Sequence, residues 1–173
     1  MKGVIADCLS KLVNSKFGSA KWHEILSMTG MDEQTVFLPS ADVDDSSLMK
    51  LLSNTCSVLN LSLNDAADAF GMYWMNEYAP VIYSIYFKWF TSAKEFIMGM
   101  DSIHDATTKS IPNAHPPRFE FNQKDERTLL VTYKSSRSMI DFYIGLVKGV
   151  GHYFKTPLSV EKISSNQVQI RFN

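Results

Sequence analysis

The stretch Tyr133-Lys134-Ser135-Ser136-Arg137 stands where an alternating apolar pattern gives way to a helical one. In an extended strand every second side chain shares a face, so Tyr133, Ser135 and Arg137 are expected to point the same way. They supply a phenol, a hydroxyl and a planar guanidinium, which suits a ligand with two carboxylates. The ordinary alternative is an edge strand with a solvated polar face.

Upstream of this stretch, apolar residues recur at helical spacing, and the pattern predicts about six helices. One long helix is expected to begin at the capping box Ser92-Ala93-Lys94-Glu95 and to run through Thr107. The aromatic segment 81–90 just before it is expected to be helical and deeply buried. This part of the chain therefore predicts a helical subdomain.

Around and after the motif the periodicity changes from helical to alternating. Alternating apolar residues predict two hairpins with one more helix between them, at 119–121 with 129–133, 139–154, and 158–163 with 168–172. The predicted fold class is α+β: an N-terminal helical subdomain of about six helices, then a small four-stranded antiparallel sheet with one further helix. Residues 1–173 are expected to form a single domain, because no linker is long enough to divide them.

The composition excludes several classes of protein. The chain has 173 residues, 45% of them hydrophobic, and a net charge of −1 without any basic run, so we expect no nucleic-acid partner. No apolar stretch approaches the roughly 20 residues of a membrane span. Two cysteines and the absence of a signal peptide predict a cytoplasmic location. Nucleophile elbows, phosphate-binding loops and zinc-protease motifs are also missing, so we expect no enzyme.

His104 lies on the apolar stripe of the predicted long helix. A neutral imidazole in such a place can bind haem iron axially, and the ordinary alternative is a core histidine. The chain also contains 11 Phe, 7 Tyr, 3 Trp and 9 Met, side chains that line cofactor pockets but also fill ordinary cores. Haem b needs both an axial base and an anchor for two propionates, which His104 and the Tyr133 motif together offer.

A Tyr-x-Ser-x-Arg motif downstream of a helical histidine, with Pro116-Pro117-Arg118-Phe119 between them, resembles the haem nitric oxide/oxygen binding (H-NOX) family. This is the sensor domain of soluble guanylate cyclase and its bacterial relatives. The similarity extends from Met1-Lys2-Gly3-Val4-Ile5 through Ala69-Phe70-Gly71 to Gly145-Leu146.

The resemblance implies a role for each matching residue. His104 matches the proximal ligand of haem b, and Pro117 matches the proline that packs on the haem and distorts it. The family's propionate-binding positions correspond to Tyr133, Ser135 and Arg137. Its distal-pocket positions correspond to Ile5, Trp74 and Leu146.

Phe142 departs from part of this family. Oxygen-binding members carry a distal tyrosine five residues after the motif arginine, where this chain has Phe142. Bound O₂ carries partial negative charge and needs a hydrogen-bond donor, whereas NO on ferrous haem depends on one much less. The expected ligands are therefore nitric oxide and CO, with discrimination against O₂. The adjacent Tyr143 is rotated about 100° away on a helix, and the indole N–H of Trp74 remains a possible weaker donor.

Two further expectations concern metals and partners. The cysteine-and-histidine metal site of some bacterial members is expected to be absent, because Cys8 and Cys56 both lie early in the chain. The family mechanism implies that NO weakens the iron–His104 bond and frees the helix. Since the chain stops at Asn173, we expect a separate partner, either a histidine kinase or a cyclic-di-GMP enzyme.

Two alternatives stay open at this point. One is a non-haem α+β ligand-binding or protein-interaction module, in which Arg137 would hold another carboxylate and His104 would belong to the core. The other is a peroxidase-like haem enzyme, for which the sequence offers no suitably placed distal acid–base residues.

Overall fold

The computed structural model describes all residues from 1 to 173, and the chain forms two compact units. The first comprises Met1–Ala66 with Ile111–His115, and the second comprises Ala67–Ser110 with Pro116–Asn173. None of the helices combines the length and the apolar character that crossing a membrane requires.

Three helices make up most of the first unit: α1 (Val4–Phe17), α2 (Ser19–Thr29) and α3 (Asp45–Leu59). Their apolar stripes are buried, as the helical spacing predicted. Asp44 is the N-cap of α3, and its carboxylate accepts a hydrogen bond of 2.9 Å from the Ser47 backbone N–H. The acidic connection before α3 therefore caps a helix.

The second unit opens with a series of short helices: most of α4 (Leu63–Tyr73), the π-helix η1 (Trp74–Tyr78), α5 (Ala79–Ile82), α6 (Ser84–Phe87), α7 (Ala93–Met98) and α8 (Met100–Thr108). The prediction of one long helix from Ser92 to Thr107 is wrong, because the helix breaks at Gly99. An ideal Cβ at Gly99 would lie 2.2 Å from Cε1 of Phe90, whose ring fills that space. The Ser92 N-cap is confirmed: its hydroxyl accepts from the Glu95 N–H at 3.2 Å.

The segment 81–90 is helical only in part, and it is not deeply buried. Val81 is 78% exposed, Ile85 63% and Trp89 50%. The helices α5 and α6 are four residues long each, so one side of each turn faces solvent while Phe87 reaches the core. The expectation of deep burial was therefore wrong, because Phe87 is the one residue of this segment that is buried.

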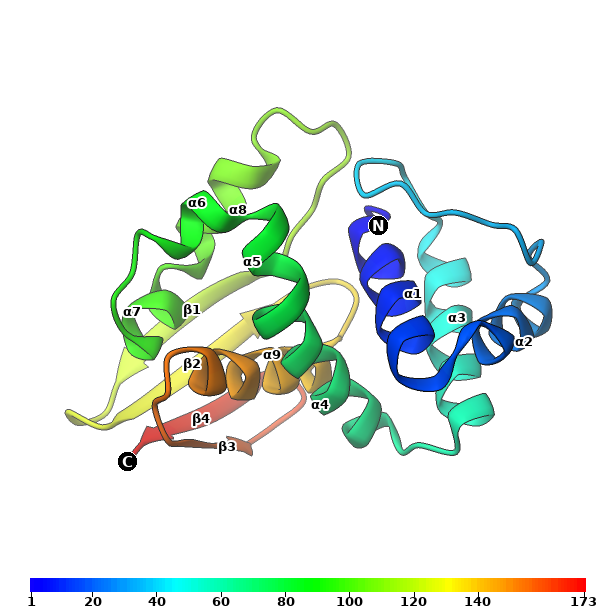
Figure 1. The fold of residues 1–173 in the computed structure, drawn as a ribbon. Helices are drawn as coiled ribbons and strands as arrows, with labels where there is room; N and C mark the ends of the chain where they lie inside the picture. The colour runs from blue at the N-terminus through cyan, green and yellow to red at the C-terminus, as the bar shows by residue number, and fades with distance from the viewer. The chain divides into compact units, whose positions relative to one another are not determined.

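A four-stranded antiparallel sheet completes the second unit (Figure 1). It contains β1 (Arg118–Gln123), β2 (Thr128–Lys134), β3 (Leu158–Lys162) and β4 (Gln167–Phe172), in the order β1-β2-β4-β3. Helix α9 (Ile140–Tyr153) lies across one face, and its Val147 and Val150 share a buried cluster with Val131 and Ile170. The predicted hairpins, their connecting helix and the α+β class are confirmed.

Glycines bring α4 and α9 into backbone contact. An ideal Cβ at Gly71 would lie 2.0 Å from the carbonyl carbon of Gly145, and one at Gly149 would lie 2.4 Å from the carbonyl oxygen of Gly71. Only residues without a Cβ allow this approach. The contact sets α9, which carries Phe142 and Leu146, directly against the helix that leads into Trp74.

Candidate functional site

His104 lies on α8 with its ring half-buried. Its Nδ1 is 3.1 Å from the backbone carbonyl oxygen of Pro117, which precedes β1. Because a carbonyl oxygen only accepts, Nδ1 carries the proton and donates it, and Nε2 keeps its lone pair. A backbone carbonyl that fixes the ring and tautomer in this way is typical of histidines that bind metals.

The electrostatic surroundings keep this imidazole neutral. Burial lowers the pKa of His104 below its ordinary value, and the nearby charge of Arg118 lowers it further. The hydrogen bond to Pro117 and the carboxylates of Asp101 and Asp105 oppose the shift only in part. Since the neutral form is the one that coordinates iron, His104 is prepared for ligation at neutral pH.

The motif residues meet in a turn and not along a strand. Strand β2 ends at Lys134, and Ser136 and Arg137 form a turn. The Ser135 hydroxyl accepts a hydrogen bond of 3.2 Å from the Arg137 backbone N–H. The extended row expected from the sequence is therefore wrong in geometry, although the turn still gathers the same three side chains.

The Tyr133 side chain shows that the three groups are close. Burial raises the pKa of the Tyr133 phenol, while a hydrogen bond with the Ser135 side chain and the charge of Arg137 act in the opposite direction. The phenol therefore keeps its proton at neutral pH and can donate. A hydroxyl pair beside a guanidinium is an arrangement that receives carboxylates well.

A layer of aromatic rings joins this anchor to His104. The ring centroids of His104 and Phe119 are 5.8 Å apart, those of Phe119 and Tyr143 are 4.8 Å apart, and those of Tyr143 and Tyr133 are 5.7 Å apart. Phe119 also faces Tyr133 across the β1–β2 ladder. The two parts of the predicted site, His104 and the Tyr133 motif, are thus brought together in the second unit.

The predicted distal residues of the second unit also gather. Phe142 is 8% exposed and packs edge-on against Phe70, with centroids 5.6 Å apart. Phe70 in turn stacks on Trp74 at 5.7 Å. Leu146 lies one turn after Phe142 on α9 and, like Trp74, is partly buried against the hydrophobic core of the second unit. Ile5, half-buried on α1, belongs to the first unit.

Sequence reasoning missed three of the aromatic residues that build this region. Phe70, Phe119 and Tyr143 connect the predicted residues through ring contacts. The alternation of Phe119 with Phe121 signalled a buried strand face, but no pattern in the sequence linked that face to His104. Tyr143 packs toward Phe119 and Tyr133, in agreement with its expected rotation away from Phe142.

A family model described as haem-NO-binding matches residues 2–162. The chain belongs to the haem-NO-binding family. Among solved structures, an oxygen-binding H-NOX domain related to soluble guanylate cyclases, in its oxygen complex, is 25% identical, with a TM-score of 0.84 over 100% of this chain and 95% of that one. A structure solved to study how porphyrin distortion by the protein modulates haem redox potential is 26% identical, with a TM-score of 0.84 over 99% and 100% of the two chains.

The fold of the haem-NO-binding family extends to more distant structures. An H-NOX protein from S. oneidensis in the Fe(II) ligation state is 20% identical, with a TM-score of 0.91 over 100% of this chain and 96% of that one. That similarity supports the fold.

The side chains of this haem-NO-binding chain fit a haem. Neutral His104, whose Nε2 keeps its lone pair, has the chemistry that an axial donor to haem iron needs. The phenol of Tyr133, the hydroxyl of Ser135 and the guanidinium of Arg137 offer donors for propionates, and the aromatic layer between them supplies apolar surface. Donor chemistry and surroundings therefore agree with the group that the family binds.

Proposed function

We propose that residues 1–173 act as one gas-sensor domain that holds haem b and binds nitric oxide and CO at ferrous iron. His104 is the proximal ligand, and Tyr133, Ser135 and Arg137 hold the propionates. Pro117 packs against the macrocycle, and the distal pocket is lined by Ile5, Trp74, Phe142 and Leu146. The membership of the chain in the haem-NO-binding family supports this proposal.

One observation carries the assignment of the proximal side: the Nδ1 of His104 donates to the carbonyl oxygen of Pro117. A core histidine that only needed a partner would be satisfied by any acceptor. Here the acceptor belongs to the residue expected to contact the haem, so that ring orientation and haem packing depend on each other. Burial lowers the pKa of His104 and keeps the ring in the form that binds iron.

Phe142 sets the gas selectivity in this proposal. The haem supplies a ferrous iron that binds diatomic gases. Phe142 is buried on α9 and contributes a ring without a donor, and the ring of Tyr143 packs against Phe119 and Tyr133. Bound O₂ lacks the stabilisation that a distal hydroxyl gives, whereas NO and CO need it much less.

Signalling follows from the position of His104. It is part of α8, a helix of nine residues that Gly99 separates from α7. With haem bound as proposed, loss of the bond between His104 and iron would leave α8 free to move, and this two-state change would bias a partner. The partner is a separate protein, either a histidine kinase or a cyclic-di-GMP enzyme, and the free Cys8 and Cys56 suit a reducing, cytoplasmic location.

Spectroscopy of the purified protein tests this proposal. The expected sample is coloured, has a ferrous Soret band that shifts with NO and with CO, and gives no stable oxygen complex in air. His104→Gly should still take up haem when imidazole is supplied but lose the effect of NO on the partner. A colourless protein that refuses haemin would leave the non-haem binding module as the better explanation, and a stable oxygen complex would refute the selectivity.

A further inference from the structure

Four oxidisable rings form a continuous row from the candidate pocket to the surface. Trp74 and Tyr83 have centroids 6.5 Å apart, Tyr83 and Tyr86 are 6.4 Å apart, and Tyr86 and Trp89 are 4.8 Å apart. The row spans η1, α5 and α6, so all of it lies in the second unit. Neighbouring rings at these separations are in contact or nearly so.

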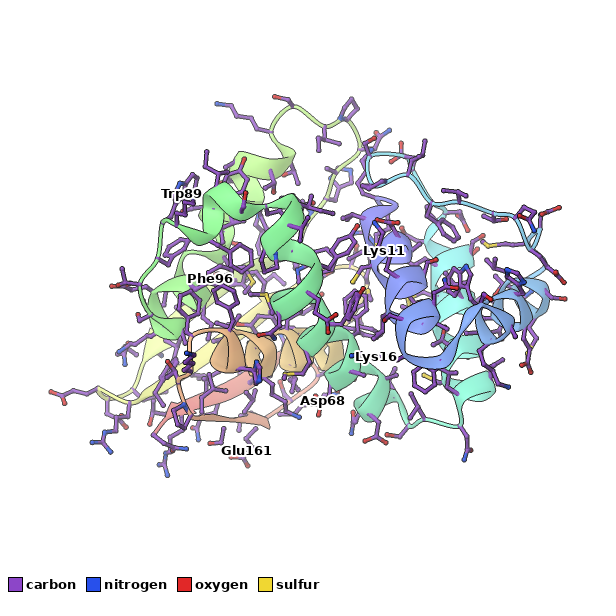
Figure 2. The ribbon with its side chains drawn as sticks, viewed as in Figure 1. Lys11, Lys16, Asp68, Trp89, Phe96 and Glu161 are labelled. Carbon is purple, nitrogen blue, oxygen red and sulfur yellow. The ribbon has the colours of Figure 1, made fainter.

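The two ends of the row have different surroundings. Trp89, which follows the end of α6, is 50% exposed and lies at the outer edge of the second unit, while the labelled Phe96 lies among packed rings (Figure 2). Trp74, at the inner end, is partly buried and stacks on Phe70, which packs against Phe142. One end therefore reaches solvent and the other reaches the residues expected to line the distal pocket.

The chemical identity of these side chains matters more than their bulk. Tryptophan and tyrosine give up one electron to moderately strong oxidants, whereas phenylalanine does not. A core needs only apolar rings, and Phe would fill these positions equally well. An unbroken Trp-Tyr-Tyr-Trp order, with one indole in water, is the arrangement that a path for single electrons requires.

We propose that Trp89, Tyr86, Tyr83 and Trp74 form a path for one-electron oxidising equivalents between the protein surface and the pocket. Its inner end rests on the proposed haem site, whereas its outer three members do not. In one direction an oxidant in solution acts at Trp89 and the ferrous iron of the proposed haem is the reductant. In the other direction the oxidising equivalent arises at Trp74 and a thiol in solution is the reductant at Trp89.

Each step on this path conserves atoms and electrons. An oxidant that takes one electron from Trp89 leaves an indole radical, which releases its N–H proton to water. Tyr86 then supplies one electron and its phenolic proton, which restores the indole and leaves a phenoxyl radical, and Tyr83 repairs Tyr86 in the same way. In the reverse direction an oxidising equivalent at Trp74 reaches Trp89, where a thiol donates one electron and one proton.

Pulse radiolysis with the azide radical tests the outer part of the path in haem-free protein. This radical becomes azide by taking one electron, preferentially from tryptophan, and Trp89 is far more exposed than Trp22 at 4%. In the parent, the indolyl absorption should decay as the tyrosyl absorption rises, at a rate independent of protein concentration. Tyr83→Phe/Tyr86→Phe keeps both rings and should lose this phase.

Tyr153→Phe is the matched control, because Tyr153 is also exposed and its ring pairs with those of Phe87 and Phe154, which are not oxidisable in the same way. In this variant the indolyl absorption should decay into tyrosyl absorption at the same rate as in the parent. The proposal is overturned if the double variant transfers as fast as the parent, or if Tyr153→Phe abolishes the phase.

Haem-loaded ferrous protein tests the inner end. Oxidation of Trp89 should convert ferrous to ferric Soret absorption, one iron for each azide radical, and the double variant should lose this conversion. Tyrosyl formation without iron oxidation would overturn the inner end of the path. A protein that takes up no haem would instead refute the proposed function. The haem-free measurement would still test electron transfer among Trp89, Tyr86 and Tyr83.

Discussion

At position 142 the side chain ends in a C–H bond, where a tyrosine would end in a hydroxyl. The ring is buried and edge-packed on Phe70, so its place on α9 is well defined. A single oxygen atom added there would lie among apolar side chains, where a hydrogen bond to a bound ligand is strengthened by the low local dielectric. Gas selectivity is therefore a property of one residue in this proposal.

We predict that Phe142→Tyr produces an oxygen complex in air-equilibrated ferrous protein, visible in its absorption spectrum. The reason is the added donor, which stabilises the partial negative charge on bound O₂. Tyr143→Phe is the control and should leave oxygen behaviour unchanged, because its ring packs against Phe119 and Tyr133. If Phe142→Tyr bound CO but formed no oxygen complex, the assignment of this position would be wrong.

His104 also links folding to pH. Burial lowers its pKa in the folded state, so the unfolded chain binds more protons as the pH falls through the ordinary histidine pKa of about 6.5. The stability that this group contributes is present above that value and is lost on acidification. Haem-free parent should therefore lose more unfolding free energy between about pH 7.5 and about pH 5 than His104→Gln, as measured by urea titration. Equal losses of unfolding free energy in the parent and in His104→Gln would contradict the lowered pKa of His104.

At the scale of elements, local signals predicted local structure. The N-caps at Asp44 and Ser92 and the two hairpins follow from side chains within a few residues of each other. The break at Gly99 does not follow from such local signals, and the Phe90 ring that packs where a Cβ of residue 99 would lie comes from nine residues earlier. The segment from Ser92 to Thr107 had the right period for one helix, but the structure interrupts it at Gly99.

The candidate site divides in the same way between local and tertiary causes. His104 and the Tyr133, Ser135 and Arg137 set were predictable because a motif and a helical stripe contain them. The layer of Phe119 and Tyr143 was not, since its rings meet only when α8, β1 and α9 pack. Even the correct motif had the wrong expected geometry, because the strand ends before Ser135.

Packing between α4 and α9 makes a prediction at this scale. Gly145→Ala should destabilise the protein by about 1–3 kcal/mol, the usual cost of overpacking, because the new Cβ would lie 2.1 Å from the Ala67 carbonyl oxygen. Backbone cannot rotate aside as a side chain can. Gly151→Ala is a graded control whose nearest contact is Cγ of the Leu158 side chain, at 2.8 Å, and it should lose less in urea unfolding. If Gly151→Ala lowered the free energy of unfolding more than Gly145→Ala does, the close approach of α4 and α9 would be contradicted.

At the scale of the whole molecule, the cysteines report on one unit. Cys8 and Cys56 are free, and both lie in the first unit. Burial raises the pKa of the Cys8 thiol strongly, with a further contribution from Asp7, whereas Cys56 is only partly buried and its pKa is raised less. The two thiols should therefore differ in reactivity as long as this unit is folded.

We predict that a disulfide reagent modifies Cys56 in the native protein and reaches Cys8 only in denaturant. Mass spectrometry of peptides after a labelling pulse measures both sites. Cys56→Ser should show no native labelling at all, which isolates Cys8 as a probe of opening in the first unit. If Cys8 were labelled as rapidly as Cys56 in the absence of denaturant, the burial of Cys8 on α1 would be contradicted.

The π-helix at Trp74–Tyr78 has a consequence for inheritance. Such a turn holds one residue more than an α-helix of the same rise, and it is usually kept where it serves a site. Losing one codon in this segment would remove the extra residue, convert the turn to an ordinary α-helical one and leave the helical turns on either side facing nearly the same way. Relatives that are one residue shorter here are therefore expected to keep the aromatic residues that follow in the same place, so an alignment gap at this point marks the loss of the π-turn and not a rearrangement of the row from Tyr83 to Trp89.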